Sequence, residues 1–144
     1  MVELEANDKR TTWLFLLISA LALAPVTAPL LAASHPVAAL LIRGFFSGLC
    51  HQDPSRSFQL AGSPIAVCVR CLGIYSGVAL SPLLHIKKEI AQRFFASAIL
   101  LNLLDVATEI LHWHGNLPIP RFLLGLLLGA AAGLILLPRT LQSV

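Results

Sequence analysis

Charged residues are scarce in this chain. Asp, Glu, Lys and Arg make up 12% of its 144 residues, about half the share found in a typical soluble domain. Apolar residues make up 57%, and the mean hydropathy is +0.82. This balance excludes a disordered chain, a nucleic-acid-binding domain and an ordinary cytosolic enzyme, and it indicates a membrane protein. The net charge of +3 needs no acidic partner, because basic residues commonly flank membrane spans.

Long stretches without charge locate the membrane spans. No charged residue lies between Thr11 and Ile42, a run of 32 residues, whereas one crossing needs about 20. The first span is expected at 13–33, with kinks at Pro25 and Pro29 whose lost backbone bonds are satisfied locally. A cleaved signal peptide is the weaker interpretation, because the apolar run is too long. Three further spans are expected at 64–85, 94–113 and 121–138, so that the chain 1–144 forms one membrane domain.

The stretch 36–50 is apolar, but it is short for a span and is interrupted by Arg43. Its apolar residues, from Val37 to Gly48, recur at helical spacing. We therefore expect a short helix that lies in the membrane interface or dips partway in. The predicted fold is an all-α integral membrane protein with about four spans and this one short interfacial or re-entrant helix. A fifth span is the alternative, and it would invert the orientation of everything after it.

The distribution of basic residues predicts the orientation in the membrane. With the N-terminus inside, six basic residues lie on the inner side: Lys9, Arg10, Lys87, Lys88, Arg93 and Arg139. Four lie on the outer side: Arg43, Arg56, Arg70 and Arg121. Most of the inner residues cluster, whereas the outer ones are single. Both termini are therefore expected in the cytoplasm and the cysteine-bearing loop outside.

All three cysteines fall within 22 residues, at the two ends of the polar loop 50–71. Cys68 and Cys71 form a C-x-x-C pair, a spacing at which two thiolates reach one metal ion from a single turn. Cys50 and His51 lie on the other side of the loop and can close the site. Three sulfurs and one nitrogen suit tetrahedral zinc or iron. Because adjacent residues are awkward joint ligands, either one of them only supports the site, or the fourth position is open to water or substrate.

Two other interpretations of the cysteines stay open. A C-x-x-C pair at the outer end of a span is similar to the dithiol of disulfide-generating quinone reductases. Those enzymes normally need a second cysteine pair, and only Cys50 remains here. The alternative without chemistry is a structural disulfide with one spare cysteine, or three small buried residues.

The third expected span carries one polar face. Asn102, Asp105, Glu109 and His112 follow one another at helical spacing and share one side. Ionisable residues within a span are costly and usually face the interior of the helix bundle. The functional interpretation is a charged pocket under the cysteine loop, with Asp105 or Glu109 as a proton carrier or an extra ligand. The structural alternative is a set of salt bridges between helices, such as Asp105 or Glu109 with Arg121.

Glycines recur every fourth residue in two of the expected spans. They are Gly73 and Gly77 in the second span, and Gly125, Gly129 and Gly133 in the last. Small residues at this spacing let two helices approach closely. We therefore expect the second and last spans to pack tightly and to help enclose the third.

One string of residues resembles the signature of a known family. It runs Cys50-His51-Gln52, Arg56-Ser57-Phe58, Gly62, Cys68-x-Arg70-Cys71-x-Gly73-Ile74-Tyr75-x-Gly77, and continues with Asp105, Arg121, Gly125 and Gly129. This pattern resembles the domain of unknown function 2085. The resemblance implies a small multi-pass protein of the prokaryotic cytoplasmic membrane and supplies no activity. Glu109 departs from the glutamine expected in relatives, so Asp105, Arg70, Arg121 and Arg56 are the stronger candidates for catalytic residues.

These observations predict a membrane-embedded metal site with a charged pocket beneath it. Its ligands would be Cys50, His51, Cys68 and Cys71, and its metal zinc or iron. The arginines favour an anionic partner, either a lipid headgroup or a small molecule. Two alternatives are a membrane thiol–disulfide oxidoreductase and an accessory subunit of a larger membrane complex or homo-oligomer. The expected partners are thus the lipid bilayer and a membrane complex, with no nucleic acid.

Overall fold

The computed structural model describes residues 2–84, 86–111, 115 and 117–136. The chain is mostly helical, as its composition predicts. In chain order the elements are α1 (Val2–Leu31), α2 (Pro36–Ser47), the 3-10 turn η1 (Pro54–Arg56), the strands β1 (Gln59–Leu60) and β2 (Ser63–Pro64), α3 (Val69–Leu80), the 3-10 turn η2 (Ser81–Leu83), α4 (Lys88–Ile110) and α5 (Pro118–Leu136).

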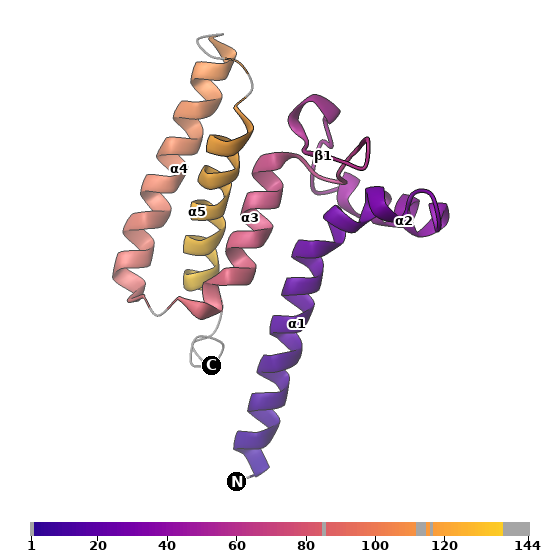
Figure 1. The fold of residues 1–144 in the computed structure, drawn as a ribbon. Helices are drawn as coiled ribbons and strands as arrows, with labels where there is room; N and C mark the ends of the chain where they lie inside the picture. Colours follow the sequence, from indigo (N-terminus) through magenta and orange to yellow (C-terminus); the bar gives the residue numbers. More distant parts are fainter. Residues whose placement is uncertain (1, 85, 112–114, 116, 137–144) are drawn as a thin grey trace.

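Four of the helices stand side by side in the order α4, α5, α3, α1 (Figure 1). Helix α2 lies across the end of α1, next to the small hairpin and the cysteine loop. The start of α1 and the end of α5 lie at the opposite end of the molecule. Within the described part of the chain, α4 packs mainly on α5. The prediction that the second and last spans enclose the third is therefore wrong.

Two of the described helices, α4 and α5, are long and apolar enough to cross a membrane. The segments Leu16–Leu31 and Val69–Leu83 are shorter apolar helices. Helix α3 has 12 residues, which corresponds to about 18 Å at 1.5 Å per residue, less than the roughly 30 Å of a hydrocarbon core. It begins at Val69 instead of 64, because the preceding residues form β2 and an extended connection.

The other predicted boundaries differ by a few residues. Helix α4 begins at Lys88 instead of 94, and α2 ends at Ser47 instead of 50. Pro118 and Pro120 lie in the first turn of α5. A proline is tolerated there because the first amides of a helix have no partner within it. The predicted ends at 85, 113 and 138 lie outside the described residues.

Helices α3 and α5 meet along their glycines, which confirms the packing that the spacing predicts. A Cβ added to Gly77 would lie 2.6 Å from the amide nitrogen of Ala130, and one added to Gly129 would lie 2.8 Å from Cα of Ile74. No side chain fits at such distances. The two backbones are therefore in direct contact.

The two prolines of α1 anchor the cysteine loop. Pro29 has no N–H, so the carbonyl of Pro25 loses its donor within the helix. The amide of Ala66 donates to that carbonyl at 3.0 Å. An amide from a distant part of the chain therefore replaces the lost donor. The prediction that this bond is satisfied locally is wrong at Pro25. Around this contact a small core forms from Phe46, Cys50, Ile65 and Val67.

A tight hairpin and two polar contacts shape the rest of the loop. Strands β1 and β2 pair antiparallel across Ala61 and Gly62, whose φ values of 51° and 76° are those of a type I′ turn. The guanidinium of Arg43 donates to the carbonyl of Pro64 at 2.5 Å. The side-chain amide of Gln52 donates to the carbonyl of Arg43 at 2.7 Å. Helix α2 and the loop are thereby joined into one unit.

Candidate functional site

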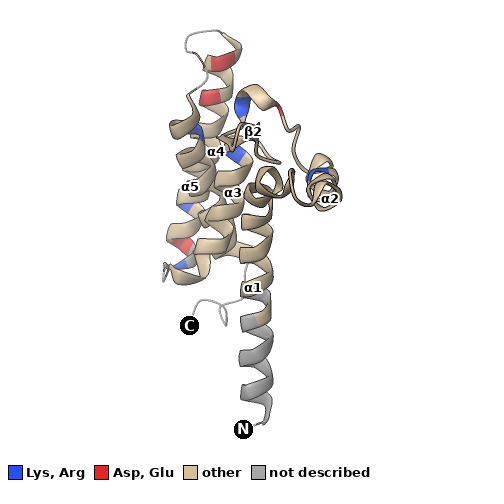
Figure 2. Cartoon of the chain, turned by 45° about the vertical axis from the view of Figure 1, so that its right-hand side comes forward, with Lys and Arg blue, Asp and Glu red and all other residues tan. Residues whose placement is uncertain are grey.

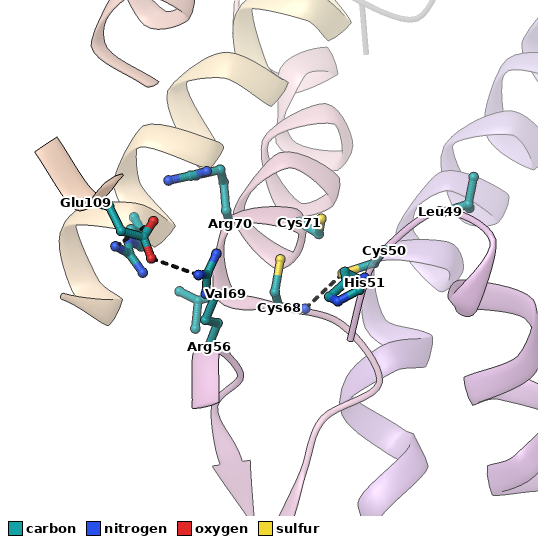
Figure 3. A pocket seen from close by; sticks show the side chains of 10 residues that line it. Leu49, Cys50, His51, Arg56, Cys68, Val69, Arg70, Cys71 and Glu109 are labelled. Atoms are coloured by element: carbon teal, nitrogen blue, oxygen red, sulfur yellow. Dashed lines mark hydrogen bonds and ion pairs between the residues drawn. The ribbon is translucent and has the colours of Figure 1, made fainter. Parts of the chain in front are cut away.

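The three cysteine sulfurs meet at the end of α3. All three Sγ atoms lie within 4.8 Å of one another, and all three residues are free thiols. Cys50 follows α2, and its amide donates to the carbonyl of Phe46 at 2.8 Å. Cys68 is the residue that precedes the first turn of α3, and Cys71 lies within that turn. Figure 3 shows Cys68 and Cys71 on α3 facing Cys50 from the other side of the loop.

The surroundings of the cluster favour a thiolate. The amide of Cys68 donates to Sγ of Cys50 at 3.2 Å. The thiol of Cys71 donates to the sulfur of Cys68 and, with the first amides of α3 and Cys50, lowers the pKa of Cys68 to about 5, although burial acts in the opposite direction. The lowered pKa favours the thiolate of Cys68, which is the form of cysteine that binds metals.

His51 is not part of the close group. The atoms that lie within 4.8 Å of one another are the three sulfurs, without a ring nitrogen of His51. The histidine lines the adjoining pocket beside Cys50 (Figure 3). The structure thus brings together three of the four predicted ligands. His51 directly follows Cys50, and adjacent residues are awkward joint ligands of one ion.

Next to the sulfurs lies a network of ion pairs that is buried at Arg121 and half-exposed at Arg56. Asp105 on α4 contacts Arg70 on α3, and its Oδ2 lies 3.4 Å from Nε of Arg121 on α5. One oxygen of Glu109 lies 3.0 Å from Nη2 of Arg121, and the other lies 3.1 Å from Nη2 of Arg56. The network therefore ties the cysteine loop, α3, α4 and α5 together. Arg121, only 3% exposed, is its most buried member.

Asp53 extends the network to the surface. Its Oδ2 lies 3.5 Å from Nε of Arg56. Its other oxygen accepts hydrogen bonds from the hydroxyl and the amide of Ser55, at 2.7 and 2.9 Å. These bonds, with a smaller contribution from Arg56, lower the pKa of Asp53. Asp53 begins η1 and so fixes the place from which Arg56 reaches the pocket.

One pocket of about 250 Å³ connects the two groups. The sulfur cluster and His51 form one wall, and Arg56, Arg70, Arg121 and Glu109 form the other. Figure 3 shows Glu109 and Arg56 facing each other across a dashed ion pair, with Arg70 above them in this view. Figure 2 places these charges at the end of the helices next to the hairpin. The structure thus has a charged pocket beside the cysteine loop, lined by Arg70 and Arg121 but not by Asp105, and salt bridges form part of its wall.

The polar face of α4 points to α5. The side-chain amide of Asn102 donates to the carbonyls of Leu124 and Ala98, at 3.2 and 2.8 Å. Asn102 thus fastens α4 to α5 below the ion pairs and does not line the pocket. The fourth residue of the predicted face, His112, lies outside the described residues.

The sequence reasoning undervalued one contributor and missed two. It ranked Glu109 below Asp105, although Glu109 lines the pocket and contacts both Arg56 and Arg121. It gave no role to Asp53, although an Asp-Pro pair followed by Ser is a common signal for a capped turn. It also treated Arg43 only as an interruption in an apolar helix, whereas Arg43 holds the hairpin through Pro64.

The described part of the chain thus combines apolar helices, two of them long enough to cross a membrane, with a cysteine and arginine cluster at one end. The chain belongs to the family described as predicted membrane protein, domain of unknown function 2085, which matches residues 50–135. The expected family is thus confirmed. The match includes the three cysteines, the three arginines of the pocket and both carboxylates.

Two archaeal relatives are similar to this chain. An uncharacterized protein of Methanocaldococcus jannaschii is 32% identical over 100 residues, which cover 65% of this chain and 64% of that protein. An uncharacterized protein of Methanothermobacter thermautotrophicus is 33% identical over 106 residues, which cover 69% of this chain and 92% of that protein. The chain therefore spans less than two thirds of the first relative. No solved structure matches it.

Proposed function

We propose that this membrane protein holds one transition-metal ion, zinc or iron, through Cys50, Cys68 and Cys71. The observation that carries the proposal is the approach of the three sulfurs to within 4.8 Å of one another. Ligands at the zinc–sulfur distance of about 2.3 Å lie about 3.8 Å apart in a regular tetrahedron. Small side-chain rotations therefore suffice to close three thiolates around one ion.

The sulfur cluster adjoins the pocket, from which a fourth ligand would come. His51 lines that pocket, and a rotation of its ring is one way to complete a closed, structural site. A water molecule or a ligand in the same position would make the site open and able to polarise what binds there. His51 is a metal ligand in the closed arrangement and is not a ligand in the open one.

The membrane topology that we propose has four crossings, by α1, α3 with η2, α4 and α5. The start of α1 and the end of α5 lie at the same end of the molecule (Figure 1), which agrees with an even number of crossings. The larger number of basic residues at that end supports a cytoplasmic location for it. The cysteine loop, the pocket and α2 are then at the outer surface.

The deciding measurement is the metal content of the purified protein by mass spectrometry, in detergent. We expect one equivalent of zinc or iron, and its loss in the double variant Cys68→Ser/Cys71→Ser, because one remaining thiolate binds weakly. His51→Ala, compared with His35→Ala at the exposed start of α2, shows whether the histidine is the fourth ligand. No metal in the wild-type protein, with thiols that react at once with alkylating reagents, would refute the metal site.

One observation favours a second candidate, a thiol–disulfide oxidoreductase. Cys71 donates to Cys68, whose pKa is lowered to about 5, and the low pKa of one thiol in a C-x-x-C pair is typical of redox-active dithiols. Thiol trapping separates the candidates. Metal-bound thiolates become reactive only after a chelator is added, whereas a redox pair becomes reactive after a reductant.

A further inference from the structure

The pocket wall opposite the sulfurs has an excess of positive charge. Three guanidinium groups, from Arg56, Arg70 and Arg121, line it together with one carboxylate, from Glu109. The second carboxylate of the network, Asp105, contacts Arg70 and Arg121 but does not line the pocket. An approaching ligand therefore meets a surface on which positive groups outnumber negative ones.

Two of the arginines keep hydrogen-bond donors for a ligand. Arg70 lines the pocket and contacts Asp105 through Nη2, and its Nε is buried, so a ligand in the pocket would meet the terminal amino groups of this guanidinium and not Nε. Arg56 contacts Asp53 through Nε and Glu109 through Nη2, and 53% of its side chain is exposed. A guanidinium has five N–H donors in a planar fork that matches the oxygens of a phosphate or carboxylate. Arg121 contacts both carboxylates and positions them.

We propose that this pocket binds an anion of the phosphate class between Arg56 and Arg70, and that the carboxylate of Glu109 is a built-in competitor for the same donors. The anion site consists of guanidinium groups and does not require the metal. The proposal rests on the proposed function only in that a metal ion would occupy the opposite wall.

The competition follows from the contacts of Glu109. Its two oxygens occupy Nη2 of Arg56 and Nη2 of Arg121. These contacts are of the kind that an external anion would make. Replacing the carboxylate by an amide removes one negative charge from the pocket and weakens the hold on both arginines. The neutral variant must then bind an anion more tightly, the opposite of what a ligand-contacting residue would show.

The size of the pocket limits the ligand. Its volume of about 250 Å³ is below the roughly 300–1,000 Å³ of pockets that enclose organic ligands of drug size. A small free oxyanion fits, and so does the phosphate group of a lipid whose tails remain in the bilayer. The shared chemistry is a tetrahedral phosphate oxyanion, and the two sources are separated by experiment.

The first arm of the test titrates inorganic phosphate into the protein in phosphatidylcholine nanodiscs, by calorimetry at constant ionic strength. We expect Arg56→Gln to weaken phosphate binding about tenfold or more, because a charge-assisted hydrogen bond is lost. Glu109→Gln should strengthen it severalfold. The matched controls are Arg93→Gln and Glu89→Gln, exposed residues in the first turns of α4, which should leave binding unchanged. If Arg56→Gln does not fold, Arg56→Lys provides the weaker, non-forked donor.

The second arm uses nanodiscs that contain phosphatidylglycerol and no free phosphate, with native mass spectrometry as the readout. Retention of this lipid by the wild-type protein but not by Arg56→Gln identifies a headgroup as the source. Binding in the first arm identifies a free anion. Absence of binding in both arms, or weaker binding in Glu109→Gln, overturns the proposal.

The two proposals can fail separately. Metal content is measured on the same preparations, and Cys68→Ser/Cys71→Ser is titrated as well. Phosphate binding without metal would refute the proposed function and leave the anion site standing. A metal-loaded protein that binds no anion would refute the anion site and leave the proposed function standing.

Discussion

Asp105 shows at the scale of one residue why the charges of this protein persist in an apolar chain. Its carboxylate is nearly buried and contacts Arg70 and Arg121. An isolated charge at such a place costs several kcal/mol, and good geometry with opposite charges offsets that cost. Two guanidinium groups on two different helices satisfy one carboxylate here. Asp105 is therefore the residue on which the packing of α3, α4 and α5 around the pocket depends.

Asp105→Asn should destabilise the protein strongly. The amide leaves Arg121 buried with one carboxylate instead of two, and breaking a buried pair from one side costs about 3–5 kcal/mol. Thermal unfolding in detergent would show a clear loss of midpoint temperature. Asp53→Asn is the matched control, because Asp53 lies at the surface and its ion pair contributes little. Equal midpoints in the two variants would contradict the role given to Asp105.

The cysteine cluster and the arginines could be predicted from the sequence, because residue type and spacing carry that chemistry. The C-x-x-C pair and the distant Cys50 do meet. What could not be predicted is how the charges are shared. Whether Glu109 pairs with Arg121 alone or also with Arg56 depends on where the loop places η1, and no local pattern specifies that. The exclusion of His51 from the sulfur cluster likewise depends on the path of the backbone.

At the scale of the elements, the contact between α3 and α5 is the most specific in the molecule. Gly129→Ala would bring a Cβ to 2.8 Å from Cα of Ile74, so the two helices must separate. Overpacking of this kind costs about 1–3 kcal/mol.

Gly44→Ala is the control, because nothing lies within 4 Å of a Cβ at that helical position. Alanine there should stabilise α2 slightly, by up to about 1 kcal/mol. The midpoint temperature of unfolding in detergent should therefore fall in Gly129→Ala and rise slightly in Gly44→Ala. A Gly129→Ala variant as stable as the wild-type protein would contradict the close packing.

The helices were predicted better than their ends. Runs without charge locate α4 and α5, because hydrophobicity is a property of each segment by itself. The start of α3 was misplaced because Pro64 is as apolar as a span residue, yet Ser63–Pro64 pairs with Gln59–Leu60. The replacement of the lost bond at Pro25 by Ala66 is a long-range event, and the sequence gives no signal for its partner.

At the scale of the whole molecule, the proposed topology predicts on which side of the membrane each end of α5 lies. Reporter fusions in a bacterial host should place the C-terminal end of α5 in the cytoplasm, where green fluorescent protein is fluorescent. Alkaline phosphatase fused after Gly115, between α4 and α5, should be active outside. The opposite pattern at both places would mean that α2 crosses the membrane as a fifth span.

The backbone contact between α3 and α5 also fixes the positions of Arg70 and Arg121 relative to each other along the helix axes. The carbonyl of Arg70 faces a Cα hydrogen of Gly125, and that of Ile74 faces Gly129, an arrangement in which Cα–H···O bonds form. Arg121 precedes Gly125 by about one turn. A slip by one glycine step would move Arg70 about 6 Å along the axis and away from Asp105. Since the main chain carries this alignment, the outward apolar side chains of both helices can change type freely while the arginines stay level.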